Sequence, residues 1–324
     1  MITPRLLRRS LRRGFRWRVL LLFWAALLLP SAIATAPAFA FLRQHLDHSP
    51  RSPHAAAWMD GETLLDLVRQ LAENGASRTI LFGLGAAALG VLVIAPFVAG
   101  AMVTSAREGE ALPLARLCAG AGGLYGRMLR TSVAGLVPLG LAAAAVAGLA
   151  KLAIGASDRA LTETAAMRGY TLAAAGAAAV LFIGHLLVDC ARAQFAADPD
   201  RRSALGALWA SVRLLARRPG RTLSIGLLGA AVGLGLPVAL MSLRLQIAQA
   251  GPVTVALAWS LAQMARVAVG WGRAARIEGL AELTHADIAE RERQKLQSNL
   301  PPAAEVVHSA TLAALEPPRS GAPR

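Results

Sequence analysis

The chain of 324 residues is poor in acidic residues, aromatic residues and cysteine. Only 19 Asp and Glu residues oppose 34 Lys and Arg residues, which gives a formal net charge of +15. Charged residues make up 16% of the chain, aromatic residues 5% and hydrophobic residues 55%. A soluble fold would alternate apolar and polar positions at a helical or strand period. The long uninterrupted apolar runs of this chain exclude that organisation.

Six apolar stretches dominate the sequence between positions 19 and 265. Each has about 20 or more residues, enough for a helix rising about 1.5 Å per residue to cross a hydrocarbon core of about 30 Å. Apolar residues in these stretches do not alternate with polar ones every second position, as they do in the strands of a membrane barrel. The sequence therefore predicts an all-α polytopic membrane protein with six transmembrane helices. These cover Val19–Leu42, Thr79–Ala106, Thr131–Ala150, Gly169–Val188, Thr222–Leu243 and Leu245–Ala265.

The positions of lysine and arginine predict the orientation of these helices, because such residues accumulate on the cytoplasmic side of membrane proteins. The two terminal segments and the gaps after the second and fourth helices hold 25 of the 34 basic residues. The other three gaps hold eight. We therefore expect both termini in the cytoplasm. Arginines that flank apolar spans, rather than line one soluble face, also argue against nucleic-acid binding.

The N-terminal region leaves an alternative open. A basic segment precedes the apolar run Val19–Leu29, and Ala38-Phe39-Ala40 fits a signal-peptide cleavage site. Arg12-Arg13-Gly14-Phe15 resembles a twin-arginine export signal. Because the apolar run continues without charge to Leu42, we favour an anchored first helix.

Two amphipathic segments outside the spans are predicted to lie at the membrane surface. One is Gly61–Asn74 in the first outer loop, for which a cap on the helix bundle is the alternative. The other is Asp198–Gly220, with Asp198 as its N-cap. A basic amphipathic helix beside the cytoplasmic face is attracted to anionic lipid headgroups. Its candidate lipid-contacting residues are Arg201, Arg202, Trp209, Arg213 and Arg217. A connector that packs only on its own bundle is the alternative.

A similar pattern recurs along the chain. The stretch 114–131 matches the stretch 205–222 at a constant offset of 91 residues, and both end in Arg-Thr at the start of an apolar span. The stretch Leu6–Arg18 is a looser third copy. These matches suggest three parallel repeats, each a cytoplasmic amphipathic helix followed by a transmembrane pair. Independent selection for basic surface helices is the alternative.

Four regions follow from these patterns. Residues 1–18 form a basic cytoplasmic segment, and residues 19–272 form the six-helix domain. Residues 273–298 have helical composition with mixed charge and are expected to form a charged cytoplasmic helix, with Thr284 as a candidate N-cap of a separate helix. Residues 299–324 are rich in proline with little to bury, which predicts a disordered tail.

Ionisable residues at membrane depth are the candidates for function. His185, Asp189 and Arg192 share one face of the fourth helix by their spacing, and Arg266 lies in the sixth. We expect Asp189 to pair with Arg192 or Arg266, which would neutralise the carboxylate and fix the fourth helix. A proton or substrate relay through His185 and Asp189 is the alternative.

No sequence pattern predicts a cofactor, a metal or an enzymatic reaction. The chain lacks G-x-x-x-x-G-K-[ST], H-E-x-x-H and G-x-S-x-G. His45, His48 and His54 cluster in the first outer loop, but prolines interrupt that segment, and we expect a solvated loop. Cys118 and Cys190 lie on the predicted cytoplasmic side, where thiols stay reduced.

The stretch from His185 to Thr222 carries a family resemblance. It combines Asp189-x-x-Arg192, an acidic cap, a Leu/Ala/Trp amphipathic helix and an Arg-Arg-Pro turn. In these features it resembles bacterial six-helix membrane proteins related to the integral membrane regions of some glycerophosphodiester phosphodiesterases. This sequence contains no catalytic barrel of that kind. The resemblance therefore implies topology and a bacterial cytoplasmic (inner) membrane location, and no activity.

These features lead to an expected function. We expect a non-enzymatic integral membrane protein that organises or assists lipids or membrane partners, with anionic lipids at its cytoplasmic face and a possible membrane-protein partner. The alternative is a small transporter with a polar path near His185, Asp189 and Arg266. Mid-membrane positions that are nearly all Ala, Leu, Val and Gly favour the first function. Prolines within three of the spans keep the second open.

Overall fold

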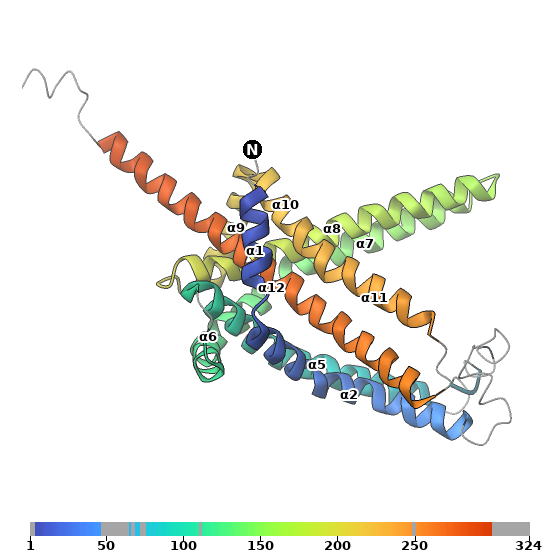
Figure 1. The fold of residues 1–324 in the computed structure, drawn as a ribbon. Coiled ribbons are helices and arrows are strands. Elements are labelled where there is room, and N and C mark those ends of the chain that lie inside the picture. The colour runs from blue at the N-terminus through green and yellow to red at the C-terminus, as the bar shows by residue number, and fades with distance from the viewer. Residues whose placement is uncertain are drawn as a thin grey trace, which may run out of the picture.

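The computed structural model describes residues 4–46, 65, 69–71, 76–109, 112–247 and 251–299, which are helical or connect helices and contain no strand. The surface-helix prediction for Gly61–Asn74, the histidines at 48 and 54, and the tail from residue 300 fall mostly or wholly outside this description. Figure 1 shows long helical hairpins that spread from a common region beside α1. The helical elements are α1 (Pro4–Gly14), α2 (Trp17–Leu46), α5 (Ala76–Glu108), α6 (Leu114–Ala134), α7 (Leu136–Ser157), α8 (Glu163–Ala197), α9 (Ala204–Arg217), α10 (Pro219–Ala230), the π-helix η1 (Ala231–Gly235), α11 (Leu236–Leu245) and α12 (Pro252–Asn299).

Six helical stretches in the described part are long and apolar enough to cross a membrane. This confirms the predicted fold class: the chain is an all-α, multi-pass membrane protein. Much of the surface of these stretches is exposed apolar side chain, as in α7, where Leu141 and Leu152 are 69% and 70% exposed. Such a surface suits contact with lipid. The helical stretches that contain these apolar segments are Trp17–His45, Ser77–Glu108, Leu114–Ser157, Glu163–Ala197, Pro219–Leu245 and Pro252–Ser298.

The last part of the chain differs from two sequence predictions. The sixth helix does not begin at Leu245, because α11 ends there and α12 starts only at Pro252. The charged segment 273–298 is not a separate helix either, since α12 runs unbroken for 48 residues, about 72 Å. Thr284 is therefore not the N-cap of a helix. It is buried in mid-helix and donates its hydroxyl to the carbonyl of Leu280, 2.8 Å away.

Proline accounts for two irregularities in the spans. Pro138 has no N–H to give to the carbonyl of Ala134, the residue at which α6 ends, and Gly135 alone separates α6 from α7. Pro237 likewise follows the π-helical turn η1. Pro96, in contrast, lies inside the continuous helix α5.

The order of elements is the same three times. A short amphipathic helix precedes a pair of long apolar helices in α1–α2–α5, in α6–α7–α8 and in α9 followed by α10–α11 and α12. Each amphipathic helix packs on the second long helix of another pair: α6 on α5, α9 on α8 and α1 on α12. The three units therefore close in a ring. Whether they are internal repeats in sequence remains a prediction.

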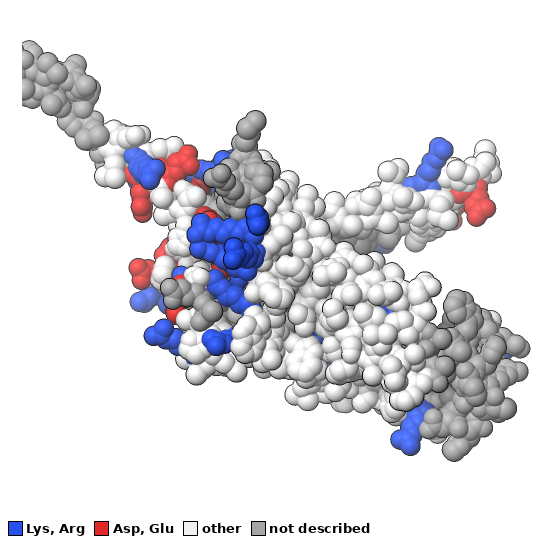
Figure 2. Space-filling view, in the orientation of Figure 1, with Lys and Arg blue, Asp and Glu red and all other residues white. Residues whose placement is uncertain are grey.

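The core lies where the three units meet. We call this region, which contains α1, α6, α9 and the end of α8, the charged end. Its largest buried side chains come from different elements, among them Leu117, Met128, Phe195 and Ile277. Figure 2 shows Lys and Arg gathered at this end around α1, whereas the hairpins that extend from it are almost uniformly uncharged until their tips. The elements that bring the candidate site together all converge here.

Candidate functional site: a buried carboxylate and the arginines of the charged end

Asp189 lies in the last turns of α8, which are buried on all sides. From Asp189 to Ala197 every residue of α8 is buried, because α5, α6, α9 and α12 all pack around this segment. A helix enclosed in this way has no face left for solvent. Any charge on it must be compensated inside the protein.

Three arginines surround the Asp189 carboxylate. Arg192 places Nη1 2.9 Å from Oδ1, and Arg276 places Nη2 3.2 Å from Oδ2. Arg273 contributes a longer contact of 3.9 Å from Nε to Oδ1. The single carboxylate of α8 therefore binds two guanidinium groups of α12 and one of its own helix, so positive charge exceeds negative charge at this site. We call Asp189 with these three arginines the Asp189 cluster.

A glycine makes this arrangement possible. A methyl group on Gly229 of α10 would lie 2.1 Å from Cγ of Arg276. The aliphatic part of Arg276 thus crosses α10 where no side chain is present. Beyond the carboxylate the cluster is not fully satisfied, because the Nε atoms of Arg192 and Arg276 are buried without a hydrogen-bond partner among the described residues.

The sequence prediction for this cluster was right in one part and wrong in another. The expected Asp189–Arg192 ion pair is present. Arg266 does not contact Asp189: its guanidinium donates to Oε1 of Gln263 at 3.3 Å, and the same oxygen accepts from the indole of Trp24 at 2.9 Å. Arg266 lies seven residues before Arg273 in α12, about 10 Å along the axis, which is too far from the carboxylate. His185, one turn before Asp189, is exposed.

Arg273 and Arg276 were not among the predicted site residues, because both follow the predicted last span, where arginines usually only flank the membrane. Their i, i+3 spacing puts them on one face of the helix, next to Gly272. That spacing is a signal, but it does not identify Asp189 as the partner.

A second set of contacts ties the N-terminus to α12. Arg16 places Nη2 2.8 Å from Oε1 of Glu278, and it also donates to the backbone carbonyls of Ser105 and Gly109 at the end of α5. Arg9 pairs with Glu282 at 3.1 Å. Because Arg16 and Glu278 are largely buried, this link is shielded from solvent and fixes α1 on the bundle.

Another arginine, Arg107, closes the end of α8. Arg107 of α5 donates from Nε and Nη2 to the carbonyl of Phe195, at 2.8 Å and 2.6 Å. The last carbonyls of a helix have no partner within it and carry partial negative charge, so a guanidinium there satisfies both needs. Arg107 thereby joins α5 to α8.

The amphipathic helix predicted between Asp198 and Gly220 forms as α9, but it starts later, at Ala204. Asp198 is not its N-cap: the backbone N–H of Asp198 bonds to Gln194 and closes α8. Ser203 caps α9 by accepting from the N–H of Gly206 at 3.1 Å. Asp198 instead pairs with Arg201 at 3.3 Å.

Helix α9 has two apolar sides. Ala207, Ser211 and Leu214 face the bundle, while Leu205 and Trp209 are 70% and 59% exposed. Four of the predicted lipid-contacting residues are exposed, namely Arg202, Trp209, Arg213 and Arg217, and Arg213 lies over the Trp209 ring at 5.3 Å. The helix therefore packs on the bundle and still presents apolar and basic groups outward.

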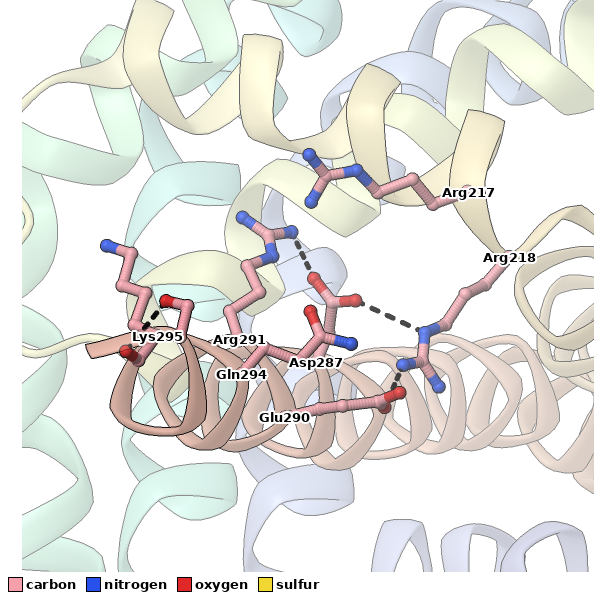
Figure 3. Close-up of a pocket in the computed structure, with 8 residues that line it drawn as sticks. Arg217, Arg218, Asp287, Glu290, Arg291, Gln294 and Lys295 are labelled. Carbon is pink, nitrogen blue, oxygen red and sulfur yellow. Dashed lines mark hydrogen bonds and ion pairs between the residues drawn. The ribbon is translucent and has the colours of Figure 1, made fainter. Parts of the chain in front are cut away.

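A polar groove of about 720 Å³ lies between the junction of α9 with α10 and the last turns of α12 (Figure 3). Arg218 holds both sides together through Glu290 and through Asp287, which lies 3.2 Å away, and Arg291 also pairs with Asp287. The hydrogen bond to Glu290 raises the pKa of the Arg218 guanidinium above its ordinary value, so it stays charged. Arg217 lines the same groove and adds further positive charge.

No metal site is formed in the described ranges, where no group of three or more His, Cys, Asp and Glu residues is placed to hold an ion. Of the outer-loop histidines, His45 is described, and its Nδ1 lies 2.8 Å from the carbonyl of Phe41.

Comparison of the chain with protein-family models, with curated proteins and with solved structures found no match. The function must therefore be argued from the molecule itself.

Proposed function

We propose that this chain is a non-enzymatic protein of a bacterial cytoplasmic membrane that gathers anionic lipids around its charged end, with both termini in the cytoplasm. The observation that carries the proposal is the placement of three basic amphipathic helices, α1, α6 and α9, at one end of the spans. That end lies where the headgroups of one leaflet would be.

Two features of the surface support this function. Exposed arginines and an exposed tryptophan lie together on α9, the combination found on helices in the membrane interface. The cytoplasmic leaflet is negatively charged, and each Lys or Arg near its surface contributes about 1 kcal/mol of attraction. The excess of basic residues at the charged end is thus matched to anionic lipid.

The alternative, a small transporter, has less support from the geometry. Its polar path would run through His185, Asp189 and Arg266. Asp189 is enclosed by three arginines, and Arg266 contacts Gln263 and not Asp189. Transport would require these ion pairs to break in each cycle.

Lipid selectivity tests the proposal. The protein is reconstituted in phosphatidylcholine vesicles that contain spin-labelled phosphatidylglycerol or spin-labelled phosphatidylcholine, and the motionally restricted fraction of each is measured. We expect the anionic lipid to be enriched severalfold next to the protein, with less enrichment at high salt. Replacing Arg202, Arg213 and Arg217 by Gln should remove a large part of the enrichment.

A matched control changes the same number of charges at the opposite end. Lys151→Gln, Arg159→Gln and Arg168→Gln alter exposed basic residues around the α7–α8 turn. These should leave the enrichment unchanged. Equal restriction of both lipids by the native protein, or the same loss in both triple variants, would refute the proposed function.

A further inference from the structure

A second groove, mostly apolar, opens between α2, α11 and α12. It has a volume of about 600 Å³, and its lining includes Trp17, Leu21, Trp24, Leu240, Met264 and Trp271. We call it the aromatic groove. Three of the six tryptophans of the chain lie in it. Trp17 and Met264 are 63% and 56% exposed, so the groove is open to the surrounding membrane and is not a closed core cavity.

The groove has the depth of one leaflet. Along α12 it extends from Trp271 to Gln263, eight residues or about 12 Å. A single leaflet contributes about half of a 30 Å hydrocarbon core. Gln263 marks the deep end, where its side-chain oxygen accepts from Trp24 and from Arg266. Trp271 marks the other end, where its indole donates to the carbonyl of Leu11 in α1 at 3.0 Å.

The mouth of the groove is basic. Phe15, which lines the groove, packs edge to face on Trp271 at 5.2 Å and directly follows the last turn of α1, which contains Arg12 and Arg13. The guanidinium of Arg18 lies over the ring of Trp17 at 5.3 Å. An apolar slot one leaflet deep thus ends beside arginines of α1 and of the start of α2, on the same side as the other basic amphipathic helices.

The dimensions favour a hydrocarbon chain over a partner helix. A helix with its side chains is about 10–12 Å wide, so a 12 Å length of it occupies on the order of 900 Å³. That exceeds the groove volume of about 600 Å³. An extended acyl chain is much narrower, and the groove falls in the usual size range of ligand pockets, about 300–1,000 Å³.

We infer that the aromatic groove holds an acyl chain of one anionic phospholipid, with the phosphate bound at the junction of α1 and α2. This inference rests on the proposed function, because the proposed function places the charged end at the cytoplasmic leaflet. It goes further in naming one retained lipid molecule and the residues that hold it.

Bromine on an acyl chain quenches tryptophan fluorescence at contact, which makes the three groove tryptophans reporters. The test uses a protein in which Trp58, Trp209 and Trp259 are replaced by Phe. It is reconstituted in vesicles that contain a low mole fraction of brominated phosphatidylglycerol or brominated phosphatidylcholine. We expect phosphatidylglycerol to quench at a severalfold lower mole fraction than phosphatidylcholine.

Filling the groove should remove this preference. Leu240→Phe with Met264→Phe adds volume inside it without adding a tryptophan. The matched control, Leu141→Phe with Leu152→Phe, makes the same kind of change on exposed positions of α7. Both double variants must elute and unfold like the parent protein. The preference should then be lost in the groove variant and kept in the control.

Other outcomes overturn the inference in distinct ways. Equal quenching by both lipids in the parent protein shows that no anionic lipid is retained. Weak quenching by both lipids in a parent protein that elutes as an oligomer, with stronger quenching once the oligomer is dissociated, shows that protein covers the groove. If spin-labelled lipid is still enriched around the protein in either case, the proposed function stands and only the groove site fails.

Discussion

The Asp189 cluster joins two helices that are far apart in the sequence. A carboxylate from α8 is compensated by Arg192 of its own helix and by Arg273 and Arg276 of α12. Removing charges from water costs free energy that their attraction only partly returns, so such a cluster is weak evidence of added stability. It does tie the two helices together, because the carboxylate lies on α8 and two of its three compensating guanidinium groups lie on α12.

Loss of the Asp189 charge should be severe. Asp189→Asn leaves three guanidinium groups close together without their common anion, and we expect about 3–5 kcal/mol of destabilisation. The measurement is the free energy of unfolding in mixed detergent micelles.

Asp198→Asn is the matched control. Asp198 pairs with a single arginine, and its side chain is 35% exposed, so we expect less than about 1 kcal/mol. Similar losses in the two variants would show that Asp189 does not hold α8 and α12 together.

Only the local half of this cluster can be predicted from the sequence. Asp189 and Arg192 are one helical turn apart, and that spacing alone indicates a pair. The partners on α12 depend on how two helices far apart in the chain cross. The sequence shows the charged residues and the glycines that permit this crossing. It does not show which two helices cross or at which residues.

At the scale of elements, small residues decide which helices come together. Gly229 of α10 and Gly233 of η1 meet Gly272 of α12, as small residues allow helix backbones to approach closely. A methyl group on Gly272 would lie 2.4 Å from the carbonyl oxygen of Gly229 and 2.5 Å from Cα of Gly233. These neighbours are backbone atoms, which cannot rotate away from an added methyl group, so the contact requires glycine. Both partners belong to the same chain, so the small residues serve packing within it.

Gly272→Ala should therefore separate α12 from α10 and η1. We expect a loss of about 1–3 kcal/mol, the usual range for overpacking. The unfolding measurement used for Asp189 applies here as well.

Gly140→Ala provides the comparison, because no atom lies within 4 Å of its added methyl group. Alanine is a better helix former than glycine, so this variant should be neutral or more stable by up to about 1 kcal/mol. A neutral Gly272→Ala would mean that the helices do not approach as closely as described.

Helix boundaries were the least predictable feature at this scale. Asp198 and Ser203 are both good N-caps within six residues of each other, and composition cannot choose between them. The choice falls on Ser203 because the backbone of Asp198 already closes α8. The existence and number of spans were predictable, since they depend only on the length of uncharged sequence.

The whole molecule is organised as a ring of three units joined at the charged end. Sequence matches at an offset of 91 residues suggested such units, and the packing of α6 on α5, α9 on α8 and α1 on α12 has the same order each time. The ring itself could not be predicted, because it requires the first and last elements to meet. Origin by repetition of one unit stays a hypothesis.

Orientation in the membrane can be tested at the same scale. We expect Asp158→Cys, in the α7–α8 turn, to react with a membrane-impermeant maleimide in intact cells. Ser298→Cys, near the end of α12, should react only after the membrane is opened. Both positions are exposed, whereas the native Cys190 is fully buried.

The parent protein with its two native cysteines gives the background for both variants. Labelling of Ser298→Cys in intact cells would place the charged end outside the cytoplasm. The proposed recruitment of cytoplasmic-leaflet lipid would then be wrong.

The contact between Arg16 and Glu278 can form only late in the synthesis of the chain. The two residues are 262 positions apart. At about 5–20 residues per second, Arg16 emerges from the ribosome roughly 13–50 s before Glu278 does. Throughout that interval α1 has no partner on α12, and the earlier hairpins must enter the membrane without the element that closes the ring. A nascent chain that lacks its last helix therefore also lacks the contact between Arg16 and Glu278 that fixes α1 on the bundle.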